Sequence, residues 1–202
     1  LVVIPITLIH QLEVQHSQQI SSRRGGEGGL LKEYKDSFPI CTKVEWSDVV
    51  EKIDNEFKEK TYKHLFEEGC PPTFVLHNSF LPGTLKDAFE EVNKKCGVTE
   101  THVYASMGNN SPTFGSHLDD MDVLIVQAIG ALQYDFAEEG GNMTSVILNP
   151  GDGLFIPKHE VHCPIVRSPR VTLSFSWDVH LPDLFWGWKV QGDNDKIKPG
   201  NG

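Results

Sequence analysis

The chain has 202 residues, of which 39% are hydrophobic and 23% are charged, and its formal net charge at pH 7 is −10. This length and composition are typical of one soluble globular domain with a sizeable core. The acidic balance argues against a general affinity for nucleic-acid phosphates, although it leaves room for a local basic patch.

The first nine residues and the spacing of the cysteines indicate in which cellular compartment the chain is expected. The apolar run 1–9 is too short to cross a bilayer and lacks the basic start and cleavage site of a signal peptide. We therefore expect a strand there and no membrane partner.

The cysteines lie far apart, without a Cys-x-x-Cys pair, at Cys41, Cys70, Cys96 and Cys163. This spacing fits neither a zinc ribbon nor a dense disulfide framework, so an intracellular, reducing compartment is expected.

The first half of the chain predicts helices on either side of one short strand. The run 21–29 is too rich in glycine for regular structure and predicts a loop. Apolar residues at helical spacing predict helices over 47–64 and 84–96, and residues 73–77 between them predict a strand.

Polar residues at the ends of these helices predict their caps. Ser47 is expected to cap the first helix, and Thr84 with Asp87 is expected to form a capping box on the second. Gly97 is expected to end the second helix in a left-handed conformation.

From Thr101 the pattern changes to short strands separated by turns. Strands are predicted over 102–106, 123–136 (one or two strands around Gly130), 145–148, 154–156 and 170–177, with a hairpin turn at 138–142. This density of strands predicts an antiparallel sandwich or barrel. We therefore divide the chain into an N-terminal region, 1–100, that packs on a β-rich core, 101–180, and a tail, 181–202.

A His-x-Asp pair, His117 and Asp119, precedes the apolar strand at 123, and His162 follows a later turn and strand. This is the spacing of a 2-His-1-carboxylate triad, which binds Fe(II) and leaves coordination positions open. Residues two apart on a strand point the same way, so His117 and Asp119 can reach one ion, with His162 supplied by another strand. The sequence predicts a metal site at these three residues. His159 is a competing ligand, and ordinary polar roles are the alternative for all of them.

The region 101–177 resembles the cupin-type, JmjC-related 2-oxoglutarate oxygenases, and within them the hydroxylases of ribosomal proteins. The segments that carry the resemblance are 117–127 and the run from the Gly-Asp turn at 151 to His162. The resemblance implies a mainly β fold, a double-stranded β-helix (cupin or jelly-roll) barrel with flanking α-helices.

The resemblance also implies roles for individual residues. His117, Asp119 and His162 would bind Fe(II) as the catalytic centre, and Tyr104, in a Val-Tyr pair on the preceding strand, would face the cosubstrate 2-oxoglutarate.

The chain departs from the family at the residue that usually holds the far carboxylate of 2-oxoglutarate. A Lys or Arg is usual fifteen residues after the first histidine, but position 132 is Leu132. Other branches use an Arg on the strand after the distal histidine, followed two residues on by Ser or Thr. Arg170, Thr172 and Ser174 match that pattern, and strand alternation places them on one polar face.

The alternative for Arg170 is a place at a solvent-exposed strand edge, and the two interpretations stay open at the level of sequence. Lys158 and Arg167 are weaker substitutes for the carboxylate partner.

The resemblance implies an Fe(II)- and 2-oxoglutarate-dependent dioxygenase that hydroxylates, or demethylates, a protein side chain. A cupin metalloenzyme that does not use 2-oxoglutarate is the alternative that Leu132 supports. A tRNA-base hydroxylase of the same superfamily and a non-catalytic binding module are further alternatives. The substrate partner is expected to be a protein, with a small molecule or tRNA as alternatives, and the sequence does not indicate the oligomeric state.

Overall fold

The computed structural model describes residues 17–19, 31–59, 63–97, 100–137 and 141–177. The strand expected at 1–9, the glycine-rich loop at 21–29 and the tail at 181–202 lie outside these residues. In the part of the chain that is described, no helix is both long and apolar enough to cross a membrane.

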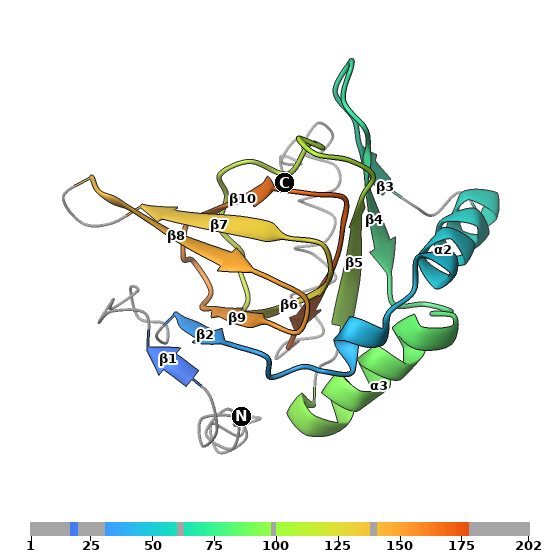
Figure 1. The fold of residues 1–202 in the computed structure, drawn as a ribbon, viewed down its shortest axis with the longest axis horizontal. Helices are drawn as coiled ribbons and strands as arrows, with labels where there is room; N and C mark the ends of the chain where they lie inside the picture. Colours follow the sequence, from blue (N-terminus) through green and yellow to red (C-terminus); the bar gives the residue numbers. More distant parts are fainter. Residues whose placement is uncertain (1–16, 20–30, 60–62, 98–99, 138–140, 178–202) are drawn as a thin grey trace, which may run out of the picture.

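The described strands form two antiparallel sheets (Figure 1). The large sheet has the order β1-β2-β9-β6-β11-β5-β4-β3, and the small sheet has the order β10-β7-β8. The large-sheet strands are β1 (Ser17–Gln19), β2 (Lys32–Tyr34), β3 (Lys63–Leu65), β4 (Thr73–His77), β5 (Glu100–Ser106), β6 (Val123–Ile129), β9 (Gly153–Ile156) and β11 (Arg170–Ser176). The small-sheet strands are β7 (Leu132–Ala137), β8 (Met143–Leu148) and β10 (His162–Val166).

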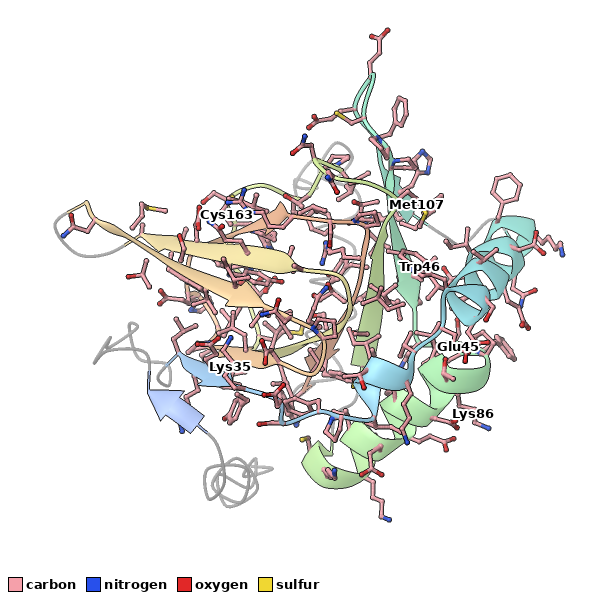
Figure 2. The ribbon with its side chains drawn as sticks, viewed as in Figure 1. Lys35, Glu45, Trp46, Lys86, Met107 and Cys163 are labelled. Carbon is pink, nitrogen blue, oxygen red and sulfur yellow. The ribbon has the colours of Figure 1, made fainter. Side chains whose placement is uncertain are left out.

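Apolar side chains from both sheets pack together in one part of the space between them (Figure 2). This core joins β6 and β9 of the large sheet to β7, β8 and β10, and its largest fully buried members include Phe136, Leu148 and Leu154. The expected mainly β, jelly-roll architecture is confirmed. Strand pairing also extends across residue 101, because β2 and β4 pair with β9 and β5.

Two helices pack on the other face of the large sheet, α2 (Trp46–Glu59) and α3 (Gly83–Cys96) (Figure 1). A short 3₁₀ helix, η1 (Cys41–Lys43), precedes α2 in the chain. Strand alternation places the apolar residues of β11 on this outer face. They join helix side chains in a second core that contains Val171, Leu173, Phe175, Leu85 and Val92. The polar face of β11 that strand alternation predicts therefore turns inward, away from the helices.

The helix predicted over 47–64 is shorter than expected. α2 ends at Glu59, and His64 belongs to β3, where it pairs with Phe74 of β4. Sheet pairing with the next strand in the chain therefore outcompetes the helical pattern in this segment. The helix also begins earlier, at Trp46, so Ser47 lies inside it and is not its cap.

The capping box predicted for Thr84 and Asp87 is wrong, because Thr84 is used in a tertiary contact instead. Its backbone N–H donates to the Asp48 carboxylate of α2 at 2.7 Å, and its hydroxyl donates to the same oxygen. The Asp48 carboxylate of α2 thus accepts a hydrogen bond from a backbone N–H group in the first turn of α3. The expected C-terminal cap is confirmed: Gly97 has φ 62°, and its N–H donates to the Asn93 carbonyl at 2.7 Å.

The segment 123–136 forms two strands separated at Gly130, which has φ 71°. A Cβ at this position would lie 2.1 Å from the Pro169 carbonyl oxygen, so only glycine fits the turn. β7 and β8 pair antiparallel, as the predicted hairpin requires, while residues 138–140 of its turn lie outside the described residues. The other strands predicted within the described residues match β4, β5, β8, β9 and β11 to within two residues at each end.

The Gly-Asp turn before β9 is organised by Asp152, which is buried. Its carboxylate accepts hydrogen bonds from the backbone N–H groups of Asp36 at 3.1 Å and Asn149 at 2.9 Å. Lys35, labelled in Figure 2 beside β2, donates to the same carboxylate at 3.1 Å. Asp152 therefore joins the β8–β9 turn to the segment after β2.

Candidate metal centre

The two histidines and the aspartate singled out in the sequence come together in the structure. His117, Asp119 and His162 each offer a ligand atom, and these atoms lie within 4.8 Å of one another. The Nε2 of His162 is 3.6 Å from Oδ2 of Asp119, and the ring centroids of the two histidines are 4.3 Å apart. A single ion can reach all three groups after only small side-chain adjustments.

The main chain positions these ligands. His117 and His162 pair as an isolated antiparallel bridge, although the segment around His117 and Asp119 is otherwise a loop and not the expected strand. The same loop is held at Asp119, whose carbonyl accepts the N–H of His159 at 2.8 Å. Backbone bonds on both sides therefore bring the His-x-Asp pair to the distal histidine.

Each histidine ring is oriented through its second nitrogen. The Nδ1 of His117 lies 2.9 Å from the carbonyl oxygen of Gly115, and the Nδ1 of His162 lies 2.8 Å from that of Glu160. A carbonyl accepts only from a protonated nitrogen, so the lone pair is left on Nε2 in both rings, as is usual for metal-binding histidines. Burial lowers the pKa of His162, which favours the neutral ring that binds metals.

His159, the competing candidate, does not join the cluster. Its side chain is 61% exposed, and its Nε2 lies 3.6 Å from the carboxylate of Asp120. Its contribution to the site is the backbone hydrogen bond to Asp119.

Arg170 is buried, with 3% of its surface exposed, so the alternative of a solvent-exposed edge is wrong. Its Nε donates to the Ser106 hydroxyl at 3.0 Å, and a terminal nitrogen donates to the Thr172 hydroxyl at 2.6 Å. Thr172 in turn donates to Oε1 of Gln127 at 2.7 Å. These contacts hold the guanidinium on the inner face of the large sheet.

The charge of Arg170 has no carboxylate partner among the described residues, where its contacts are the two hydroxyls and the face of the Tyr104 ring, 5.8 Å away. Burial lowers the pKa of this guanidinium. A buried cation without a counter-charge is costly. The arrangement therefore suits a small anion that enters the space between the sheets.

Two tyrosines lie between Arg170 and the metal-binding residues. Tyr134, on β7 of the opposite sheet, has its ring centroid 5.7 Å from that of His162. Burial raises the pKa values of Tyr104 and Tyr134; the negative charge of Asp119 raises them further, and Arg170 opposes the shift. Within the described residues, neither tyrosine hydroxyl makes a hydrogen bond, so both can serve a ligand.

Sequence reasoning missed Tyr134, although a signal was present. Leu132, where the resembled family usually has a cation, is fully buried in the core between the sheets. Strand alternation places Tyr134, two residues further on, on the same inward face.

Apolar side chains flank the ligands on the outside. Phe114 is 49% exposed, and its ring meets those of His117 and Tyr104 edge-on, at 5.8 Å and 6.2 Å between centroids. Leu118, between the two loop ligands, and Val161, next to His162, are also exposed. These side chains give the surroundings of the cluster an apolar surface.

No protein-family model matches the sequence, and no curated protein matches it. Among solved structures, the chain is similar to YcfD, a ribosomal oxygenase from Escherichia coli, in complex with cobalt and 2-oxoglutarate, at 15% identity and a TM-score of 0.47. For the complex with cobalt and succinic acid, the identity is 18% and the TM-score 0.46. The comparisons cover 68% and 69% of this chain and 43% of YcfD, so the chain spans less than half the length of that protein.

YcfD is a ribosomal oxygenase, the class of protein that the motifs of this chain resemble. A structure of protein NMB1881 from Neisseria meningitidis is also similar, over 39% of this chain and 73% of that protein, at 19% identity and a TM-score of 0.31. At these identities the likeness describes the fold alone.

Proposed function

We propose that this chain is an Fe(II)- and 2-oxoglutarate-dependent oxygenase that hydroxylates a protein side chain. One observation carries the proposal: Arg170, buried and without a carboxylate partner among the described residues, and the converging 2-His-1-carboxylate cluster share two tyrosine neighbours, Tyr104 and Tyr134. Tyr104 and Tyr134 interact electrostatically with both Arg170 and Asp119. A cation-binding group and an anion-binding group thus adjoin the same pair of tyrosines.

The donor set fits Fe(II). Two neutral imidazoles and one carboxylate are the facial-triad ligands of non-haem iron oxygenases, and three protein ligands leave other positions open. His117, Asp119 and His162 would hold the ion, and the carbonyls of Gly115 and Glu160 would keep both rings in the metal-binding tautomer. With 2-oxoglutarate and O₂, the bound metal would supply oxidation of a substrate C–H bond coupled to formation of succinate and CO₂.

The anion-binding group fits the far carboxylate of 2-oxoglutarate. Arg170 can bind it with charge-assisted hydrogen bonds, and Ser106 and Thr172 fix the plane of the guanidinium. The hydroxyls of Tyr104 and Tyr134 are the further donors available to a bound carboxylate. This arrangement replaces the cation that the family usually places where Leu132 stands.

The substrate is proposed to be a protein. The apolar side chains of Phe114, Leu118 and Val161 can exclude water around a bound peptide, and the net charge of −10 disfavours tRNA. Demethylation of an N-methyl group would use the same residues, since it also starts at a C–H bond.

An anaerobic titration of the purified chain with Fe(II), with and without 2-oxoglutarate, tests the proposal. We expect one ion at the His117 cluster, tighter 2-oxoglutarate binding when iron is present, and slow conversion of 2-oxoglutarate to succinate in air. If the iron-loaded chain neither binds nor converts 2-oxoglutarate, the oxygenase proposal fails. The cupin metalloenzyme that does not use 2-oxoglutarate would then replace it, as the apolar Leu132 position would favour.

A further inference from the structure

A second group of two histidines and a carboxylate converges within the described residues. His77, Glu100 and His102 each offer a ligand atom, and these atoms lie within 4.8 Å of one another. The Nε2 of His102 is 3.7 Å from Oε1 of Glu100, and the ring centroids of the two histidines are 5.2 Å apart. We propose that this group is a second metal site, which binds Zn(II) and links β4 to β5.

The sheet itself positions this group. His77 ends β4 and lies directly opposite His102 of β5 in the antiparallel register. Glu100 is two residues before His102 on the same strand, so its side chain leaves the same face of the sheet. Adjacent strands therefore bring all three ligands together without any loop, and ligands on strands are held more rigidly than ligands on loops.

A buried ion pair on α2 anchors the end of β4 that carries His77. Oε1 of Glu56 accepts the backbone N–H of His77 at 2.9 Å, and the same oxygen lies 2.6 Å from Nζ of Lys52. Lys52 and Glu56 are both buried, and Lys52 also donates to the carbonyl of Ser79, just beyond the strand. These bonds hold the backbone of His77 from the helix side while its ring faces His102.

The chemistry of the group suits Zn(II). Two imidazoles and a glutamate are a known ligand set for zinc, with a further position left for water. All three side chains are partly buried, so a bound ion would be partly shielded from solvent. The distance from Nε2 of His102 to Oε1 of Glu100, 3.7 Å, is close to the 3.6 Å between Nε2 of His162 and Oδ2 of Asp119 in the first cluster.

The two sites are separate and would be filled independently. The ring of Tyr104 stacks on His102 at 6.3 Å, and Phe114 lies between Tyr104 and His117, at 6.2 Å and 5.8 Å from them. Binuclear centres hold their ions about 3.5–4 Å apart, which two intervening rings exclude. The second site does not depend on the proposed oxygenase activity, because its ligands are different residues.

The test is the zinc stoichiometry of the full chain. Metal-free protein would be titrated with Zn(II) against a chromophoric chelator, and wild type is expected to bind two ions, one at each cluster. Glu100→Gln and His102→Ala should each bind one ion. His117→Ala should also bind one, and the combined His102→Ala and His117→Ala variant should bind none. His64→Ala, on the neighbouring strand β3, is the matched control and should bind two.

The outcomes separate this inference from the proposed function. Wild type that binds a single ion, lost in His117→Ala, would overturn the second site and leave the first intact. Two ions retained in both Glu100→Gln and His102→Ala would also overturn it. Glu100→Gln preserves the size of the side chain and removes its charge, so the stoichiometry can be read on a folded variant, checked by near-UV circular dichroism, even if His102→Ala does not fold.

Discussion

His117 and His162 exchange two backbone hydrogen bonds, and in each the N–H of one donates to the carbonyl of the other at 2.9 Å. The main chain therefore sets the separation of the two imidazoles before any ion arrives. We expect the metal-free chain to be folded, unlike zinc fingers, whose fold requires the metal. Circular dichroism and thermal unfolding in excess chelator check this expectation, and loss of cooperative unfolding under those conditions would contradict it.

Removal of a ligand should remove the iron. Asp119→Ala and His117→Ala are each expected to lose stoichiometric Fe(II) binding in an anaerobic titration, because two remaining ligands cannot form the triad. His159→Ala is the matched control: its ring is exposed, and only its backbone N–H bonds to Asp119, so binding should stay close to wild type. Unchanged binding in both ligand variants would mean that the ion is held elsewhere.

Arg170→Ala should weaken 2-oxoglutarate selectively. A charge-assisted hydrogen bond contributes about 1.5–3 kcal/mol, which corresponds to roughly a ten- to a hundredfold loss of affinity. Fe(II) binding should be unaffected, since Arg170 contacts Ser106 and Thr172 and none of the ligands. Both affinities can be measured by equilibrium titration. Arg167→Ala, which removes a guanidinium bonded to Gln133 at 3.0 Å, should bind 2-oxoglutarate like wild type.

The Cys41 thiol should resist alkylation in the folded chain. Cys41 is fully buried, and burial raises the pKa of its thiol to about 12. Only the thiolate reacts, and a thiol with that pKa is roughly one part in 10⁴ ionised at pH 8. Native iodoacetamide treatment followed by mass spectrometry should find Cys41 unmodified, whereas treatment in denaturant should modify it. Equal labelling rates in the two conditions would show that Cys41 is accessible.

Gly130→Ala should destabilise the fold more than Gly141→Ala. Both glycines have a left-handed backbone, with φ of 71° and 83°, so both substitutions carry a strain of about 1–2 kcal/mol. Only at Gly130 would the new Cβ also meet backbone, 2.1 Å from the Pro169 carbonyl oxygen, while at Gly141 no atom of the described residues lies within 4 Å of it. Denaturant unfolding of the two variants measures the difference, and equal losses would show that the turn moves freely to make room.

The sequence indicated the features that depend on local spacing. Strand alternation separated the polar from the apolar face of β11, and the interval between His-x-Asp and the distal histidine identified a candidate ligand set that the structure brings together. The prediction for β11 holds because the direction in which a side chain points follows from its position along its own strand. His117 and Asp119 lie on a loop instead, and backbone hydrogen bonds between His117 and His162 bring them to the distal histidine.

The tertiary structure decided which strands and helices become neighbours. The Asp48 carboxylate of α2 took the place of the capping box expected from Thr84 and Asp87 on α3. The burial of Arg170, the approach of Tyr134 from the opposite sheet, and the meeting of His77 with His102 followed from strand order and register. Such contacts depend on the free energy of burying surfaces far apart in the chain, which no local pattern encodes.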